Sequence, residues 1–288
     1  MTGSLKLLME LTKFWIALTS TLSALAAFIL AGGGVSWKIA AVFFGVLLTA
    51  AGACALNEAQ EWRRDGRMER TRGRPIPSGR IAPGEAAGVA AALVALGSGV
   101  LLVWTNAPAA ILALLAVLWY NGVYTYLKRW SAFAVVPGAV IGAIPPAIGW
   151  VAAGGRLLDP RDAVICFFFF MWQIPHFWLL LFKYGSDYER AGFPTLTALF
   201  KPDQLARITF TWIAATAVSC LLLPLFHVVG TAVVGYALAA AGMGLIAATA
   251  GLVRARVDLA GFRRAFRTIN VFALAVMLCM VADPYLSR

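Results

Sequence analysis

The length, composition and charge of the chain exclude most classes of soluble protein. Of 288 residues, 61% are apolar and only 13% are charged, whereas soluble domains have about 45–50% apolar and about 25% charged residues. The apolar residues fall into blocks of about 20, the length that crosses ~30 Å of hydrocarbon. The net charge of +11 does not require nucleic acid, because membrane proteins collect Lys and Arg on their cytoplasmic loops. We therefore expect a polytopic membrane protein in the lipid bilayer, with no nucleic-acid partner.

The apolar blocks predict an all-α protein with nine transmembrane helices and no separate soluble domain, so that residues 1–288 form a single transmembrane domain. The four cysteines lie inside these blocks without the C-x-x-C spacing typical of a zinc site. The predicted spans cover residues 12–31, 38–60, 84–104, 108–127, 131–153, 162–182, 204–226, 231–252 and 268–286.

The basic residues predict the orientation of these spans. Twenty of the 24 Lys and Arg residues lie in the N-terminal segment and in alternate connections, and cytoplasmic loops are the ones that retain such residues. This distribution predicts a cytoplasmic N-terminus, an odd number of spans and an external C-terminus. We expect the protein in the inner (plasma) membrane of the cell. Glu61, Asp65 and Asp187 fall on the same side, so we expect the active site on the cytoplasmic side.

The first group of candidate site residues lies where the second span ends. Asn57, Glu61 and Asp65 are four residues apart, so on a helix they lie along one face. Their oxygen atoms suit Mg²⁺, which typically binds one or two carboxylates together with substrate phosphates. The alternative is a solvated helix end in which Glu61 pairs with Arg64, and the spacing alone leaves both interpretations open.

An arginine-rich segment, residues 67–80, follows this group. Its Gly and Pro residues predict turns rather than one continuous helix. Arginines beside carboxylates can bind phosphate oxygens while a metal ion bridges the others. The alternative is a positively charged loop that contacts anionic lipid, which explains the arginines but not the neighbouring carboxylates.

A second polar cluster lies at the cytoplasmic end of the sixth span. Within residues 183–194, Asp187 and Glu189 can supply a second metal site, although an ordinary loop is the alternative, above all for Asp187 considered alone. His176 and Gln173 lie about two turns inside the span, where burial of a polar side chain is costly unless it has a partner or a function. For His176 a purely structural role is the alternative.

Both segments resemble a known family. Asn57-x-x-x-Glu61-x-x-x-Asp65, followed by Met68-x-Arg70-Thr71-x-x-Arg74-Pro75, is similar to the first signature of the UbiA-type intramembrane prenyltransferases. The segment 172–178 and the following Asp187-Tyr188-x-x-Ala191-Gly192 resemble the haem O synthase branch, the protohaem IX farnesyltransferases, as do residues 11–13 and 137–150. Arg63 and Ser186 stand where that branch often has acidic residues.

The resemblance implies nine helices around a central cavity and transfer of a farnesyl group from farnesyl diphosphate to a vinyl group of haem B. It implies that Mg²⁺ is the cofactor and that His176 orients the porphyrin or its iron. The implied metal ligands, which are also catalytic residues, are Asn57, Glu61, Asp65 and Asp187, and the implied diphosphate-binding residues are Lys13, Arg70, Arg74 and Lys183.

Two other functions remain open at this stage. One is a UbiA-type reaction on an aromatic or quinone precursor or a lipid. The other is a non-catalytic membrane transporter or a haem-binding assembly factor. A transporter more often carries polar groups near the bilayer midplane, whereas the acidic residues here cluster at one interface. The acceptor, the prenyl chain length, the number of metal ions and the oligomeric state are not determined by the sequence.

Overall fold

The computed structural model describes residues 3–254 and 259–286, and these residues form helices and connecting segments without any strand. The prediction of an all-α protein is confirmed. In chain order the helices are α1 (Gly3–Leu11), α2 (Phe14–Leu30), α3 (Lys38–Asp65), α4 (Pro83–Trp104), α5 (Ala107–Val117), the π-helix η1 (Leu118–Tyr124), α6 (Thr125–Leu127), α7 (Val135–Gly138), α8 (Val140–Ala152), α9 (Pro160–Arg190), α10 (Leu196–Leu199), α11 (Pro202–Ser219), α12 (Leu222–Leu225), α13 (Ala232–Thr249), α14 (Gly251–Arg254) and α15 (Leu259–Leu286).

Within the described residues, eight helical segments are long and apolar enough to cross a membrane. A ninth candidate is the pair α1 and α2, which is bent by 60°. The bend is at Lys13, which adopts a left-handed backbone conformation with φ of 47°. The structure therefore agrees with the predicted nine spans when this bent pair is counted as one.

Several helices extend beyond the predicted spans, and one extension changes the interpretation of the second cluster. Asp159 caps the start of α9 by accepting the backbone N–H of Arg161. The helix then continues to Arg190, and Gly192, which has a φ of 80°, follows the C-cap residue Ala191 and turns the chain out of the helix. Lys183 and Asp187 consequently lie on the last turns of a helix and not in a loop. A helical position fixes the direction of these side chains more firmly than a loop would.

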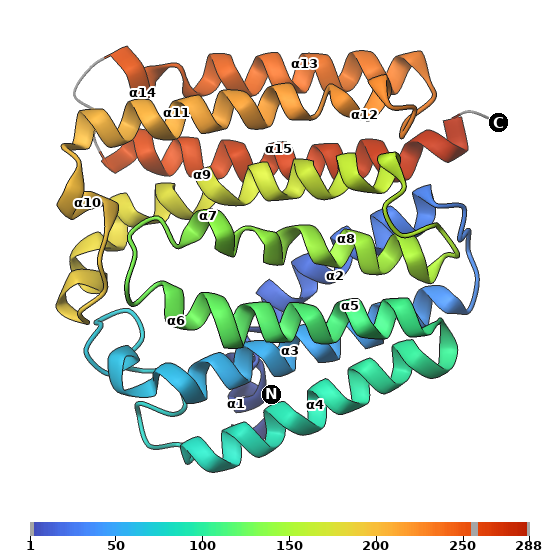
Figure 1. Ribbon diagram of the computed structural model, residues 1–288. Helices are drawn as coiled ribbons and strands as arrows, with labels where there is room; N and C mark the ends of the chain where they lie inside the picture. Colours follow the sequence, from blue (N-terminus) through green and yellow to red (C-terminus); the bar gives the residue numbers. More distant parts are fainter. Residues whose placement is uncertain (1–2, 255–258, 287–288) are drawn as a thin grey trace.

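Four helices form the centre of the bundle. α2 packs against α8, α8 against α9, α9 against α15, and α15 against α2, so that each of these helices contacts the next in a closed ring. In Figure 1, α11 and α13 lie along one side of this group, and α3 and α4 along the other. The contact between α2 and α8 is close because a Cβ atom on Gly149 would lie 1.8 Å from the backbone oxygen of Ala24.

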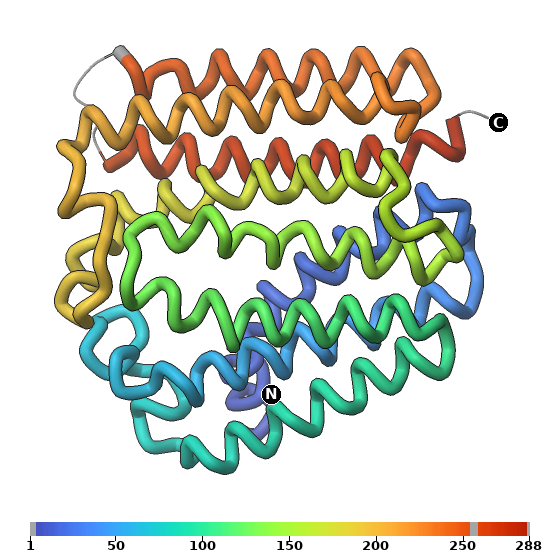
Figure 2. The backbone as a smooth tube through the Cα atoms, viewed as in Figure 1, coloured from blue at the N-terminus to red at the C-terminus, as the bar shows by residue number. Residues whose placement is uncertain are grey.

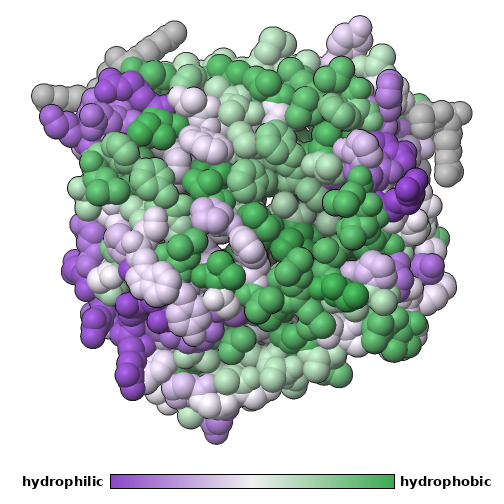
Figure 3. Space-filling model, viewed as in Figure 1, coloured by the Kyte–Doolittle hydropathy of each residue, from purple (hydrophilic) through white to green (hydrophobic). Residues whose placement is uncertain are grey.

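Three connecting segments gather at one end of the bundle, which we call the polar end. They are residues 66–82, 128–134 and 191–201, and they lie together at the left of Figure 2. Figure 3 shows hydrophilic residues along the same edge and mainly hydrophobic residues over the face beside it, with a smaller hydrophilic group at the opposite edge. Exposed apolar side chains such as Leu102 and Tyr236 give the outer helices the surface expected beside lipid.

Candidate active site

Asn57, Glu61 and Asp65 lie on the last turns of α3 and are all buried, with no more than 5% of each residue exposed. The Asn57 amide donates to Glu61 Oε2 at 3.0 Å and to Thr125 Oγ1 at 3.1 Å. The Lys13 ammonium donates to Asn57 Oδ1 at 2.8 Å, which is possible because the bend between α1 and α2 directs this side chain toward α3. Buried polar groups need such partners, and here the partners come from the bend between α1 and α2, from α3 and from α6.

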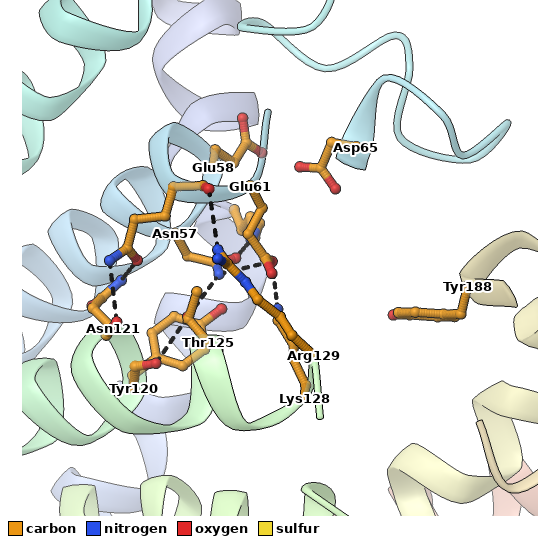
Figure 4. Close-up of polar contacts among 12 residues, drawn as sticks. Asn57, Glu58, Glu61, Asp65, Tyr120, Asn121, Thr125, Lys128, Arg129 and Tyr188 are labelled. Carbon is orange, nitrogen blue, oxygen red and sulfur yellow. Dashed lines mark hydrogen bonds and ion pairs between the residues drawn. The ribbon is translucent and has the colours of Figure 1, made fainter. Parts of the chain in front are cut away.

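Lys128, which follows α6, forms an ion pair with Glu61 (Figure 4). One interpretation of the sequence paired Glu61 with Arg64. In the structure the partner is instead Lys128, which lies 67 positions away in the chain. Glu61 Oε1 is buried and has no hydrogen-bond partner. Figure 4 also shows the Tyr188 hydroxyl, which comes from α9, pointing toward Glu61 and Lys128.

Arg74 binds two carboxylates of α3. Its Nη1 lies 2.7 Å from Asp65 Oδ2, and its Nε lies 3.5 Å from Glu58 Oε1. Burial lowers the pKa of Arg74, but the negative charges of Asp65 and Glu58 raise it by more, so the guanidinium stays charged. Glu58 is fully buried, neither of its oxygens has a hydrogen bond, and its carboxylate points away from Lys128 in Figure 4.

The sequence did not single out Glu58 or Lys128. Two features of the sequence could have pointed to these residues as members of the site. Glu58 is next to Asn57, and Lys128 lies in a short basic connection on the predicted cytoplasmic side. Neither signal specifies a partner, because pairing across helices depends on how the helices pack.

Asp187 holds the arginine-rich segment against α9. Its two carboxylate oxygens accept the backbone N–H groups of Glu69 at 3.3 Å and of Arg70 at 3.2 Å, and it also pairs with Arg190. The Arg70 side chain donates to the Tyr188 hydroxyl at 3.2 Å. The two motifs are therefore in contact although more than 110 residues separate them in sequence.

Lys183 and His176 do not contact the group around Asn57. Lys183 is exposed and its ammonium lies 4.6 Å from the centre of the Tyr184 ring. His176 lies further along α9, where its Nδ1 is 2.8 Å from Asn270 Oδ1 on α15. Of the predicted site residues, the structure thus joins Lys13, Asn57, Glu61, Asp65 and Arg74 in one region, places Asp187 and Arg70 beside it, and separates Lys183 and His176 from it.

The chemistry of the donor set suits Mg²⁺ in part. In the described part of the chain, no three Asp, Glu, His or Cys side chains converge on one metal position. Both carboxylate oxygens of Asp187 accept hydrogen bonds from backbone N–H groups. However, Mg²⁺ needs only one or two carboxylates when substrate phosphates supply other ligands. Glu61 Oε1 is free of hydrogen bonds, and Asp65 and Asn57 offer further hard oxygen atoms on the same helix.

Comparison with known proteins relates this geometry to a family. Residues 17–272 match the model of the UbiA prenyltransferase family. The chain is 37% identical over 281 residues to a protohaem IX farnesyltransferase of Oleidesulfovibrio alaskensis, with 95% of each chain covered. It is 39% identical over 215 residues to a protohaem IX farnesyltransferase of Geobacter sulfurreducens, covering 73% of this chain and 78% of that protein.

Solved structures share the fold at lower identity. A structure of digeranylgeranylglyceryl phosphate synthase gives a TM-score of 0.77 at 17% identity, covering 97% of this chain and 98% of that one. A UbiA homologue from Archaeoglobus fulgidus, bound to DMAPP and Mg²⁺, gives a TM-score of 0.65 at 15% identity, with 94% and 99% covered. From the matched family model, the relatives and the shared helical fold, we conclude that this chain belongs to the UbiA prenyltransferase family.

Proposed function

We propose that the protein is a Mg²⁺-dependent haem O synthase, which transfers the farnesyl group of farnesyl diphosphate to a vinyl group of protohaem IX. The main support is the 37% identity to a protohaem IX farnesyltransferase along 95% of both chains. The charged groups buried at the polar end give this proposal a physical basis. Lys13, Arg74 and Lys128 each contact a side chain of α3 there.

The difficult step of prenyl transfer is ionisation of the allylic C–O bond, which separates a farnesyl cation from diphosphate. Lys13, Arg74 and Lys128 supply positive charge where the leaving group becomes more negative. Mg²⁺, held by Glu61, Asp65 and Asn57 together with phosphate oxygens, would neutralise further charge on the diphosphate. The carboxylates of α3 pair with Arg74 and Lys128, so these two positive charges are held where the diphosphate is proposed to bind.

Asp187 acts in this proposal by positioning the arginine-rich segment, because its carboxylate fixes the backbone at Glu69 and Arg70. Arg70 is thereby kept beside Tyr188 at the polar end. The apolar bundle holds the isoprenoid and limits the access of water to the farnesyl cation. The vinyl group then attacks the cation, and water adds to the resulting carbocation and loses a proton to give the hydroxyethylfarnesyl product.

The proposal includes the cellular location. The inner membrane, with the polar end in the cytoplasm, is supported by the concentration of Lys and Arg in the segments at that end. Both substrates are amphipathic, with polar groups that suit a membrane interface and apolar groups that suit the bundle.

The test uses the purified protein in lipid nanodiscs with farnesyl diphosphate, haem B and Mg²⁺. Mass spectrometry of the extracted haem should show the addition of one farnesyl group and one hydroxyl group, and chelation of Mg²⁺ should stop the reaction. Asp203→Asn is a suitable control because it removes an exposed carboxylate that pairs only with Arg207 among the described residues, so activity should persist. Unchanged haem together with prenylation of a small aromatic acid would refute the proposal in favour of another acceptor.

A further inference from the structure

A π-helix interrupts the span that precedes Lys128. Helix η1 lies between α5 and α6, and in a π-helix the backbone hydrogen bonds join residues five positions apart instead of four. The backbone N–H of Thr125 accordingly donates to the backbone oxygen of Tyr120. Each residue of an α-helix turns the chain by about 100°, so the additional residue of the π-turn rotates everything after it by about that angle. The π-helix therefore determines which face of α6 is directed toward α3.

Asn121 fixes this turn against α3. Its side-chain amide donates to the backbone oxygen of Ala53 at 3.0 Å and to Gln60 Oε1 at 3.1 Å. Gln60 Nε2 in return donates to the backbone oxygen of Asn121 at 3.1 Å. Three hydrogen bonds thus join the π-helix to positions two turns apart on α3, which holds the rotation of the following residues in place.

Two residues that follow the π-helix contact the polar end of α3. Thr125 Oγ1 accepts a hydrogen bond from the Asn57 amide at 3.1 Å, and Lys128 forms the ion pair with Glu61. Residues three or four positions apart lie on one face of a helix, so both pairs join the same two faces. Figure 4 shows Asn121, Thr125 and Lys128 directed toward α3 from one side of their span. Both contacts therefore depend on the rotation that η1 introduces.

The direction of each hydrogen bond around Asn57 follows from the chemistry of the groups. The Thr125 hydroxyl donates its one hydrogen to the backbone oxygen of Tyr120 at 2.9 Å, so toward Asn57 it can only accept. The Asn57 amide donates one N–H to Thr125 and the other to Glu61. Its oxygen Oδ1 is thereby directed at the Lys13 ammonium, which can only donate.

The bond from Thr125 to Tyr120 is unusual for a threonine in a helix. Thr49, Thr209 and Thr249 are also buried, and each donates to a backbone oxygen four positions earlier, as is common for helical threonines. Thr125 instead donates to an oxygen five positions earlier, because the π-helix brings that oxygen within reach. The π-helix thus both aims the Thr125 hydroxyl at α3 and fixes its hydrogen.

We propose that Thr125 is a positioning residue for prenyl transfer, which acts through Asn57 and keeps Asn57 Oδ1 directed at Lys13 and at the proposed diphosphate site. This inference rests on the proposed function. A carbonyl oxygen has two lone pairs, of which Lys13 uses one and the other suits Mg²⁺. Without the Thr125 hydroxyl, one buried N–H of Asn57 would lose its acceptor, and the free-energy cost would favour rotation of the amide out of this arrangement.

The experiment measures binding of inorganic pyrophosphate and Mn²⁺, a paramagnetic substitute for Mg²⁺, to the protein in nanodiscs by electron paramagnetic resonance. Thr125→Val has a similar size but no hydroxyl, and it should weaken this binding about 10-fold. Thr125→Ala should give a similar loss and serves where the valine variant does not fold. Thr125→Ser keeps the hydroxyl and should bind nearly normally.

Thr209 gives a matched control, because it is also fully buried and its hydroxyl bonds only the backbone of its own helix among the described residues. Thr209→Val should leave the affinity unchanged. Unchanged affinity in the two Thr125 variants without a hydroxyl would overturn the proposal, and so would an equal loss in Thr125→Ser or in Thr209→Val.

A double variant tests the route through Asn57. In Asn57→Ala protein, the addition of Thr125→Val should cause no further loss of affinity, since Thr125 acts on the site only through Asn57. A further loss would overturn this route. Farnesylation of haem by the native protein in the same preparations would show that the proposed function survives such a failure. Conversely, the expected binding pattern without any modification of haem would refute only the proposed acceptor.

Discussion

Replacement of Asp187 by Ala should release the arginine-rich segment from α9. The carboxylate accepts two backbone N–H groups of this segment, from Glu69 and Arg70. Hydrogen bonds to a charged group contribute about 1.5–3 kcal/mol each. The distances of 3.3 and 3.2 Å favour the lower value, and the pair with Arg190, whose side chain is 59% exposed, adds little. The expected loss is about 3 kcal/mol, or roughly 100-fold in the equilibrium between docked and released segment.

Amide hydrogen exchange measures this release directly. Peptides containing Glu69 and Arg70 should exchange up to roughly 100-fold faster in Asp187→Ala than in the native protein, because both amides lose their acceptor. Asp187→Asn, which retains one acceptor oxygen, should be intermediate. Asp203→Ala is the control, since its carboxylate is 58% exposed and pairs with Arg207 on the same helix. Unchanged exchange in Asp187→Ala would show that the remaining contacts, which include the apolar cluster of Met68, Ala191 and Phe193 and the hydrogen bond from Arg70 to Tyr188, suffice to hold the segment.

Three further perturbations test the ion pairs and the packing. Lys128→Met should destabilise the protein by about 3 kcal/mol, because the buried Glu61 carboxylate loses its ion-pair partner, as measured by the unfolding midpoint in detergent. Asp65→Ala should lower kcat for prenyl transfer by ~10²–10³ while the helical circular dichroism stays unchanged. Gly149→Ala should lower stability by about 1–3 kcal/mol, since the new Cβ would lie 1.8 Å from the Ala24 backbone oxygen and force α2 and α8 apart.

Each of these perturbations has a control. Lys128→Arg keeps the charge and should retain most of the stability, so an equal loss in both variants would contradict the ion-pair argument. Normal turnover in Asp65→Ala would remove this carboxylate from the proposed reaction. Gly244→Ala adds a methyl group where no atom lies within 4 Å, and it should be harmless. If it destabilised the protein as much as Gly149→Ala, close packing would not be the cause.

The all-α membrane class, the approximate spans and the end of the bundle that carries the polar residues could all be predicted from the amino-acid sequence. These features depend on local properties, because about 20 consecutive apolar residues suffice to specify a span. The regular spacing of Asn57, Glu61 and Asp65 likewise placed them on one face of a helix, as observed. The predicted boundaries differ from the observed ones, since α9 continues eight residues past its predicted end.

Which polar groups contact one another became clear only from the packing of the helices. Glu61 pairs with Lys128 across 67 positions, and His176 meets Asn270 across 94. Asp187 binds backbone N–H groups instead of joining the side chains of α3. Sequence spacing cannot predict such partners, because helices that are distant in the chain approach each other through packing of their apolar faces. The buried polar groups then take whichever donors and acceptors that packing brings within reach.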